Sequence, residues 1–288
     1  MSAASSAPMR DPDAAIRPWV ENRPSEGFFP GLNVGELWAF RELAYVLAIR
    51  DIKIRYKQAL FGFGWAVLQP LIAVAIFSFV FGHVTHVPTQ GIPYPVFVYS
   101  GLAVWFFFSA GVNAAAQSLV GNAALVTKTY FPRILAPLAS ILPASIDLAI
   151  SLAIVTVFMV GYSVEPTAAL ALLPVWIVGL FVLTLGFGVW VSALNVRYRD
   201  VRYVLGFLVQ TLLYASPVVF PSVLIEGAWR YAYALNPVVG VIDGFRWSLV
   251  GGSSPHASDI VSFAVMLVVL VSGLVYFRRV ERRFADVI

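Results

Sequence analysis

The 288-residue sequence contains no cysteine and few charged residues. The absence of cysteine excludes disulfides and thiolate metal sites. Charged residues make up 12% of the chain, about half the share usual in soluble domains, whereas 60% of the residues are hydrophobic. The longest clearly polar stretch is Met1–Pro30, so the chain has no room for a large soluble domain.

A phosphate-binding loop is also absent. Such a loop needs two glycines before a Lys-Ser or Lys-Thr pair, because their backbone N–H groups cradle phosphates. Lys128-Thr129 is the only pair of this kind, and Asn122 and Thr127 stand where the glycines would be. The three histidines have no metal-ligand spacing, and no Ser/His/Asp arrangement is suggested. We therefore expect no catalytic residue, no metal and no cofactor bound by this chain.

Long apolar runs predict six transmembrane helices. Each is long enough to cross a hydrocarbon core of about 30 Å. The expected fold is an all-α polytopic membrane protein. The predicted spans are Trp65–Gly82, Val96–Ala116, Ile134–Val160, Leu170–Leu194, Tyr203–Phe220 and Ile260–Phe277.

The distribution of Lys and Arg predicts the orientation of these spans. All but two of the 19 cations precede the first span, follow the last span, or lie in the loops after spans two and four. The exceptions are Arg230 and Arg246. Because cationic loops face the cytosol, both termini are expected there. The pI near 9.4 reflects this topology, and nucleic acid is not an expected partner.

Residues 1–35 are predicted to form a disordered cytosolic tail, because the stretch is rich in Ala, Ser and Pro and does not resemble a signal peptide. Residues 36–58 are predicted to form an amphipathic interface helix, and 59–288 the transmembrane domain. Phe40, Leu43, Ala44 and Leu47 fall on one face of that helix. Its cations could meet lipid phosphates or a partner, or the helix could simply anchor the first span.

A re-entrant helical hairpin is predicted at 221–252, before the last span. The stretch divides at Asn236-Pro237, where Asn can cap a helix and Pro can begin it. Gly251-Gly252 ends the second piece. Pieces of this length are too short to cross the membrane. The alternative is a loop that lies flat on the outer surface.

Asp147 lies midway along the third predicted span. A carboxylate there is costly unless it is paired or functional. It could belong to a proton relay, or it could be a packed residue hydrogen-bonded to Ser145, Ser151 or a neighbouring span.

An aromatic stripe on the fifth predicted span suggests a route for substrate. Tyr203, Phe207, Gln210 and Tyr214 fall within about 60° of one another on a helix. The first span repeats the pattern with Phe61, Trp65, Leu68, Ile72 and Phe79. Aromatic rings could let a glycan slide without tight binding. Ordinary helix packing and an interfacial aromatic belt are alternatives that the pattern leaves open.

Several short motifs occur together and in order between Arg50 and Trp247. The set resembles the membrane subunits of polysaccharide-exporting ABC transporters, the O-antigen and teichoic-acid type. The motifs are Tyr56-Lys57-Gln58, Leu60-Phe61-Gly62, Gly64-Trp65-Ala66-Val67-Leu68-Gln69-Pro70, Ile92-Pro93-Tyr94-Pro95, Ser118-Leu119-Val120-Gly121-Asn122, Lys128-Thr129-Tyr130-Phe131-Pro132-Arg133, Leu194 through Tyr203, Ser216-Pro217-Val218, Leu235-Asn236-Pro237 and Gly244-Phe245-Arg246-Trp247.

The resemblance implies that two copies form one channel and that each binds a separate cytosolic ATPase subunit, which would hold ATP and Mg. It implies that the first and fifth spans line the channel. It also implies that the surface helix and the loop after the second span contact the ATPase, which would involve Arg50, Lys53, Lys57, Lys128, Tyr130 and Arg133. The position of Arg197, Arg199 and Arg202 at the cytosolic mouth would let them meet a lipid pyrophosphate or the ATPase, and the alternative is that they bind the phosphates of membrane lipids.

The expected function is that of a permease rather than an enzyme. It would move a lipid-linked, O-antigen-like polysaccharide across the bacterial inner membrane. The alternatives are an ABC permease for another lipid or amphiphile, an ion-coupled secondary transporter, and a membrane-embedded glycan-processing enzyme. The last would need paired carboxylates or a metal motif near one surface.

Overall fold

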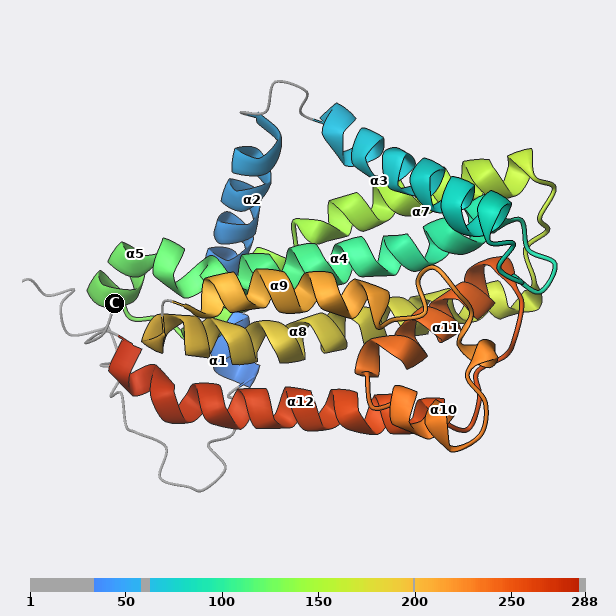
Figure 1. Ribbon diagram of the computed structural model, residues 1–288. Helices are drawn as coiled ribbons and strands as arrows, with labels where there is room; N and C mark the ends of the chain where they lie inside the picture. Colours follow the sequence, from blue (N-terminus) through green and yellow to red (C-terminus); the bar gives the residue numbers. More distant parts are fainter. Residues whose placement is uncertain (1–33, 58–62, 199, 285–288) are drawn as a thin grey trace, which may run out of the picture. The chain divides into compact units, whose positions relative to one another are not determined.

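The structure is a computed structural model that describes residues 34–57, 63–198 and 200–284 (Figure 1). The chain divides into two units, Met1–Leu32 and Asn33–Ile288, and only the second is described here. The predicted tail lies outside the described residues except for its last two positions. Every regular element among the described residues is helical, which agrees with the predicted all-α class.

Twelve α-helices are interspersed with shorter 3₁₀ and π segments in the described part of the chain. In order they are α1 (Val34–Ala39), α2 (Arg41–Lys57), α3 (Phe63–Phe77) with the π segment η2 (Ser78–Val84), α4 (Tyr94–Gly121), α5 (Ala123–Lys128), α6 (Leu135–Ile141), α7 (Ala144–Gly161), η3 (Ala168–Leu172), α8 (Leu173–Arg197), α9 (Val201–Tyr214), η4 (Ser222–Leu224), α10 (Ala228–Tyr233), α11 (Pro237–Val250), α12 (Asp259–Val280) and η5 (Glu281–Arg283).

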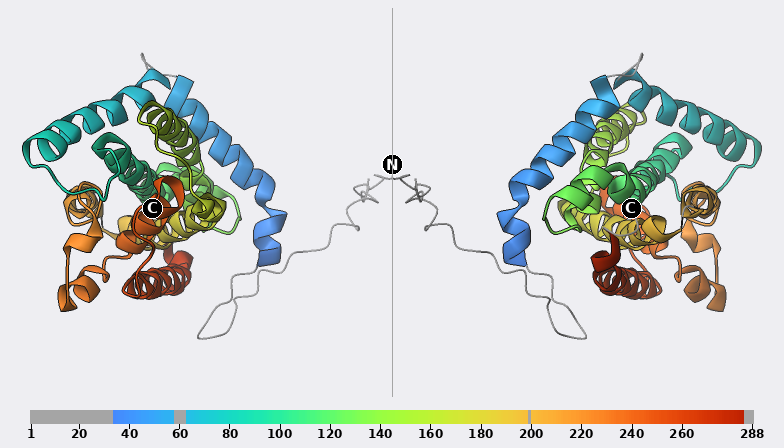
Figure 2. Two further views of the ribbon diagram at one scale, coloured as in Figure 1. Left: turned by 90° about the vertical axis from the view of Figure 1, so that its right-hand side faces the viewer. Right: turned by 90° about the vertical axis from the view of Figure 1, so that its left-hand side faces the viewer.

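Helix α4 lies at the centre of the packing. Helices α6, α7, α8 and α11 contact it, and most of its length is buried. Trp105, Phe107 and Phe108 are almost fully buried, because the central helix is covered on nearly every side. The run Trp105–Phe108 therefore belongs to the core. Helices α4, α8 and α9 lie side by side, and α12 packs on α8 (Figures 1 and 2). We call the two ends of this arrangement the α5 end and the α10 end.

Five helical segments are long and apolar enough to cross a membrane. They match five of the six predicted spans: Gly64–Val84, Tyr94–Gly121, Leu135–Gly161, Ala168–Arg197 and Asp259–Val280. The fifth predicted span, Tyr203–Phe220, is helical only as far as Tyr214. The chain then continues to Phe220 in buried, irregular turns that include Pro217, which has no N–H to donate to a helix.

The third span is broken at Leu142-Pro143, between α6 and α7. Proline cannot donate the hydrogen bond that would continue a helix across this point. The break places Asp147 in the first turn of α7. Its sequence position midway along the apolar run therefore does not place it in the middle of a continuous helix.

The predicted helix at 36–58 is divided at Phe40 into α1 and α2. Phe40, Leu43 and Ala44 pack against a buried cluster that includes Phe131 and Phe277, and Leu47 is buried as well. The four predicted residues therefore share one packed face. Helix α2 runs across the long helices and contacts α6 (Figure 1).

The two halves of the predicted hairpin differ in regularity. The second half is α11, which Asn236 caps by accepting a hydrogen bond from the Val238 N–H at 3.1 Å. Helix α11 ends before Gly251, whose φ of +80° is readily adopted only by glycine, so the predicted boundaries are confirmed. The first half contains only η4 and the six-residue α10.

Candidate functional site

Helix α9 presents its predicted aromatic stripe to the outside of the unit. Tyr203 and Phe207 are each 70% exposed, Tyr214 is 59% exposed, and Gln210 is exposed between them. Leu205 and Val209, on the opposite face, are buried and point toward the core. The stripe is therefore not covered by packing within one copy of the chain. Whether the stripe faces a pore stays a prediction.

Helix α3 and the π segment η2 after it expose a second face of large side chains. Trp65, Leu68, Ile72 and Phe79 are all about half exposed or more, whereas Val74 is buried against the core. Phe61, the first member of this predicted set, lies outside the described residues. Seen end-on, α3 and α9 lie on the same side of the helical unit (Figure 2). The two predicted channel helices thus border one side of the unit in one copy of the chain.

The predicted cationic mouth lies at the start of α9, between α8 and α9. Arg197 lies over the ring of Tyr198 and Arg202 over the ring of Tyr203, each with its guanidinium carbon 5.2 Å from the ring centre. Both arginines are exposed, so their donors can reach an external anion. Arg199 lies outside the described residues.

Three of the predicted ATPase-contact residues, Lys128, Tyr130 and Arg133, lie at the α5 end. Tyr130 donates a hydrogen bond to Glu36 of α1 at 2.8 Å, and its ring packs edge-on against Phe40. Burial and the Glu36 carboxylate raise the pKa of Tyr130. Arg133 donates to the Glu281 carbonyl after α12, and Lys128 is exposed at the end of α5. Segments from three parts of the sequence therefore form one surface.

Arg50 joins α2 to the junction between α4 and α5. Its guanidinium donates to the Asn122 side chain at 2.6 Å and forms an ion pair with Asp51 at 2.7 Å. Asn122 also donates to the Ser118 carbonyl, which fixes the amide. Lys53 is exposed on α2, and the side chain of Lys57 lies outside the described residues. The two elements predicted to meet the ATPase are thus linked to each other.

Asp147 pairs with α2, not with the serines near it in sequence. The Tyr56 hydroxyl donates to Asp147 at 2.5 Å, and Arg55 forms an ion pair with the same carboxylate. Burial and the adjacent carboxylate raise the pKa of Tyr56, which keeps the hydroxyl protonated. The carboxylate is matched by a cation and a donor, so the packed-residue interpretation of Asp147 fits better than a proton relay.

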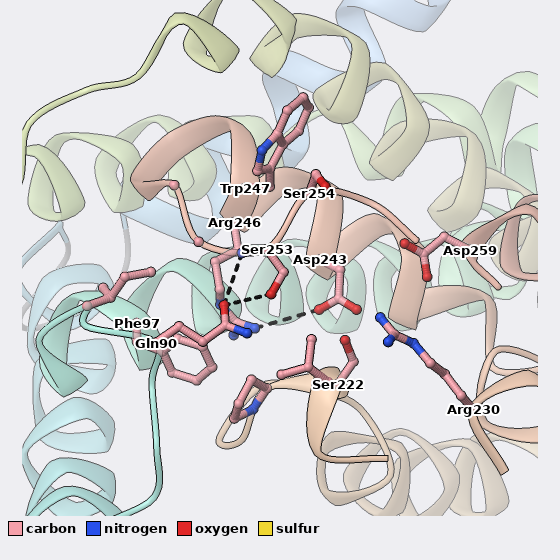
Figure 3. Close-up of a pocket in the computed structure, with 15 residues that line it drawn as sticks. Gln90, Phe97, Ser222, Arg230, Asp243, Arg246, Trp247, Ser253, Ser254 and Asp259 are labelled. Atoms are coloured by element: carbon pink, nitrogen blue, oxygen red, sulfur yellow. Dashed lines mark hydrogen bonds and ion pairs between the residues drawn. The ribbon is translucent and has the colours of Figure 1, made fainter. Parts of the chain in front are cut away.

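Arg246 of α11 forms a buried polar cluster that the sequence did not reveal. Its side chain is only 5% exposed, and Asp243 approaches it to 3.8 Å. Both line a small cavity of about 30 Å³ near the α10 end, which Gln90, Arg230 and Asp259 also border (Figure 3). In Figure 3 Asp243 and Arg246 point toward each other. The side-chain carbonyl of Gln90 accepts a hydrogen bond from the Ser253 hydroxyl. The one sequence signal was an Asp and an Arg three residues apart within an apolar helix.

Comparison with protein families decides which class this arrangement belongs to. Residues 42–250 match the model of the ABC-2 type transporter family. The chain belongs to the ABC-2 type transporter family. The match begins in α2 and ends at the last residue of α11, so it includes both exposed faces, α5, Asp243 and Arg246, whereas α1 and α12 lie outside it.

Individual members of the ABC-2 family resemble the chain over most of its length. The O-antigen export system permease protein RfbA of Myxococcus xanthus is 30% identical over 241 residues, which cover 83% of this chain and 92% of the relative. A Klebsiella pneumoniae protein of the same name is 26% identical over 257 residues, 89% of this chain and 97% of the relative. The polysialic acid transport protein KpsM of Escherichia coli is 28% identical over 242 residues, 82% of this chain and 92% of the relative.

Proposed function

We propose that this ABC-2 permease is the membrane subunit of an ATP-driven polysaccharide exporter, which moves a lipid-linked glycan out of the cytosol. The observation that carries the proposal is the family match over 42–250, together with relatives named for O-antigen export and polysialic acid transport. The exposed aromatic and amide side chains of α9 supply a surface suited to sugars, because rings stack on C–H faces and Gln210 can bond hydroxyls.

The chain crosses the inner membrane six times, with α9 and the turns after it as the fifth span. Fourteen helical residues rise about 21 Å, which is short of the roughly 30 Å core. The segment Ala215–Phe220, in which Ser216 through Val219 are buried, supplies the remaining depth. Irregular backbone is tolerated within a membrane only where protein covers it, as it does here. Helices α10 and α11 then form the re-entrant hairpin on the outer side.

The α5 end faces the cytosol, and the α10 end faces outward. Lys128, Arg133, Arg197 and Arg278 all lie toward the α5 end, which supports this orientation. We infer that both termini are cytosolic. Helix α2 then lies at the cytosolic membrane surface, where Asp147, Arg55 and Tyr56 pair at the membrane boundary.

Two copies of the chain pair so that their α3 and α9 faces enclose one channel. Helix α3 is the least buried of the long helices within a single copy, so most of its apolar surface needs a neighbour. A pore lined by Trp65, Tyr203, Phe207, Gln210 and Tyr214 would be apolar enough for sugar rings to slide and polar enough to stay wet. Arg197 and Arg202 at its cytosolic mouth would receive the lipid pyrophosphate.

Each copy binds one cytosolic ATPase subunit, which holds ATP and Mg. One surface supports this assignment; it is made by α1, α2, α5 and the Tyr130–Arg133 loop. It exposes Lys53 and Lys128, and the hydrogen bond from Tyr130 to Glu36 links the loop to α1. Nucleotide-driven movement of the ATPase would reach α7 through α2, which Arg50 and Tyr56 connect to both α5 and α7.

Purification of the chain with its cognate ATPase subunit tests this function. We expect a complex with two copies of each subunit, whose ATP turnover rises when lipid-linked polysaccharide is added to proteoliposomes. A monomeric chain that transports substrate without an ATPase would contradict the proposal. Turnover stimulated by a simple lipid but not by a glycan would favour the alternative cargo.

A further inference from the structure

The segment that follows α9 is held by side chains rather than by a regular backbone ladder. Ala215 through Val219 is irregular, and Ser216, Val218 and Val219 are almost completely buried. Buried carbonyl groups need hydrogen-bond donors, and here no continuing helix supplies them.

Three side chains provide those donors. The Arg246 guanidinium donates to the carbonyls of Pro217 at 2.8 Å and Val218 at 3.1 Å. The Asn236 amide donates to the Ala215 carbonyl at 3.0 Å. The Tyr94 hydroxyl donates to the Val219 carbonyl at 2.8 Å. Four carbonyls are therefore bonded by residues distant in sequence.

The donors belong to the most firmly packed elements of the unit. Tyr94 begins α4, the central helix, while Asn236 and Arg246 belong to α11 and its cap. Arg246 also lies 3.8 Å from the centre of the Phe97 ring and donates to Ser100 at 3.3 Å, both on α4. A Cβ at Gly101 would lie 2.5 Å from the Arg246 guanidinium, so the absence of a side chain there makes room for it.

The other end of α9 is held differently. Asp200 precedes α9 without capping it through its side chain, and the flanking Arg197 and Arg202 are exposed. Helix α9 is therefore fixed by side-chain donors at its outer end, whereas Tyr198 and Asp200 near its inner end are exposed. A helix held in this way swings about its fixed end.

We propose that Tyr94, Asn236 and Arg246 form a clamp that positions the outer end of α9, so that α9 pivots about Ala215–Val219 when the exporter works. The inference rests on the proposed function, in which α9 lines a channel between two copies. Movement of the channel wall is then largest at the cytosolic mouth near Tyr203 and smallest near Tyr214. The three residues are positioning residues, since they act through α9.

Spin-label distances in the assembled exporter test the pivot. The chain contains no cysteine, so Tyr203→Cys and Tyr214→Cys each introduce a single label per copy, and the unsubstituted chain in the same complex measures background from the ATPase. Distances between the two copies are compared without nucleotide and with trapped ATP. We expect the Tyr203 pair to change by about 5 Å and the Tyr214 pair by less than about 2 Å.

Near-isosteric variants then release the clamp. Asn236→Asp keeps an acceptor for the helix cap but loses the donor to Ala215, and Tyr94→Phe loses only the hydroxyl. Arg246→Lys keeps the charge without the forked donors. Each should broaden the Tyr214 distances and make them respond to nucleotide. Arg230→Lys is the matched control, since Arg230 borders the same cavity but donates no hydrogen bond to the segment among the described residues.

The outcomes separate the pivot from the proposed function. Equal nucleotide-driven changes at Tyr203 and Tyr214 would overturn the pivot while leaving the paired channel intact. Unchanged Tyr214 distances in properly folded Asn236→Asp and Tyr94→Phe complexes would overturn the clamp. The absence of any dipolar interaction at both positions would overturn the paired channel and the pivot with it.

Discussion

Helices α9 and α12 both expose large side chains, but the chemistry of their exposed faces differs. Helix α12 shows Leu267, Val268 and Val271, all aliphatic and each more than half exposed. Helix α9 shows Tyr203, Phe207 and Tyr214 with Gln210 among them. Aliphatic side chains suit lipid tails, whereas rings with hydroxyl and amide groups suit a wet path for sugars. Exposure alone therefore does not assign a membrane helix to lipid or to a pore.

Substitutions on the exposed faces of α9 and α12 should differ most in their effect on glycan export. Substitution of Tyr203, Phe207 and Tyr214 together by Ala should lower export about tenfold or more, because the glycan loses the three ring faces on which its C–H groups can stack. The matched triple substitution of Leu267, Val268 and Val271 by Ala should leave export near the wild-type level. Glycan export by cells with equal amounts of folded permease measures both. Wild-type export by the α9 variant would show that its face does not line the path.

A smaller effect on export is expected from substitution of Asp147. This substitution tests the alternative that the chain is an ion-coupled transporter in which Asp147 relays protons. In Asp147→Asn the amide still accepts from Tyr56 but loses the ion pair with Arg55, whose side chain is 41% exposed. The Asp147 side chain is only 14% exposed, so the pair is expected to contribute about 1 kcal/mol, the upper end for exposed pairs, and export should stay within about fivefold of wild type. ATP-dependent uptake into inverted vesicles measures this. Complete loss of transport by a folded, ATPase-bound variant would favour ion coupling.

The apolar runs predicted the long helices because length and hydropathy are local properties. The cap at Asn236 and the glycines after α11 were also predictable, since capping depends on adjacent residues. The end of α9 at Tyr214 was not predicted, because the uncharged run continues through Phe220, although Pro217 is a local signal against a continuing helix. The donors from Tyr94, Asn236 and Arg246 that stabilise the segment after Tyr214 come together only in the fold.

The partners of charged residues were likewise beyond local sequence patterns. Asp147 was expected to bond to nearby serines or a neighbouring span, yet Arg55 and Tyr56 come from a helix about 90 residues earlier. In the sequence, Arg246 is one of two cations on the predicted outer side and part of the Gly244–Trp247 motif, and neither feature indicates burial. Its burial follows from tertiary packing, because α11 folds against α4. Helical periodicity identified the α9 stripe, but only the fold established that it is exposed.

The accessibility of single cysteines to a charged, water-soluble thiol reagent tests most directly whether α9 lines a wet channel. Because the chain has no cysteine of its own, Phe207→Cys and Val268→Cys can be compared without background from this subunit. Both positions are highly exposed in one copy of the chain, at 70% and 65%. We predict that Phe207→Cys in the assembled exporter reacts with the reagent, while Val268→Cys is protected by lipid. Equal protection of both, or a reaction only at Val268→Cys, would contradict the assignment of α9 to the channel.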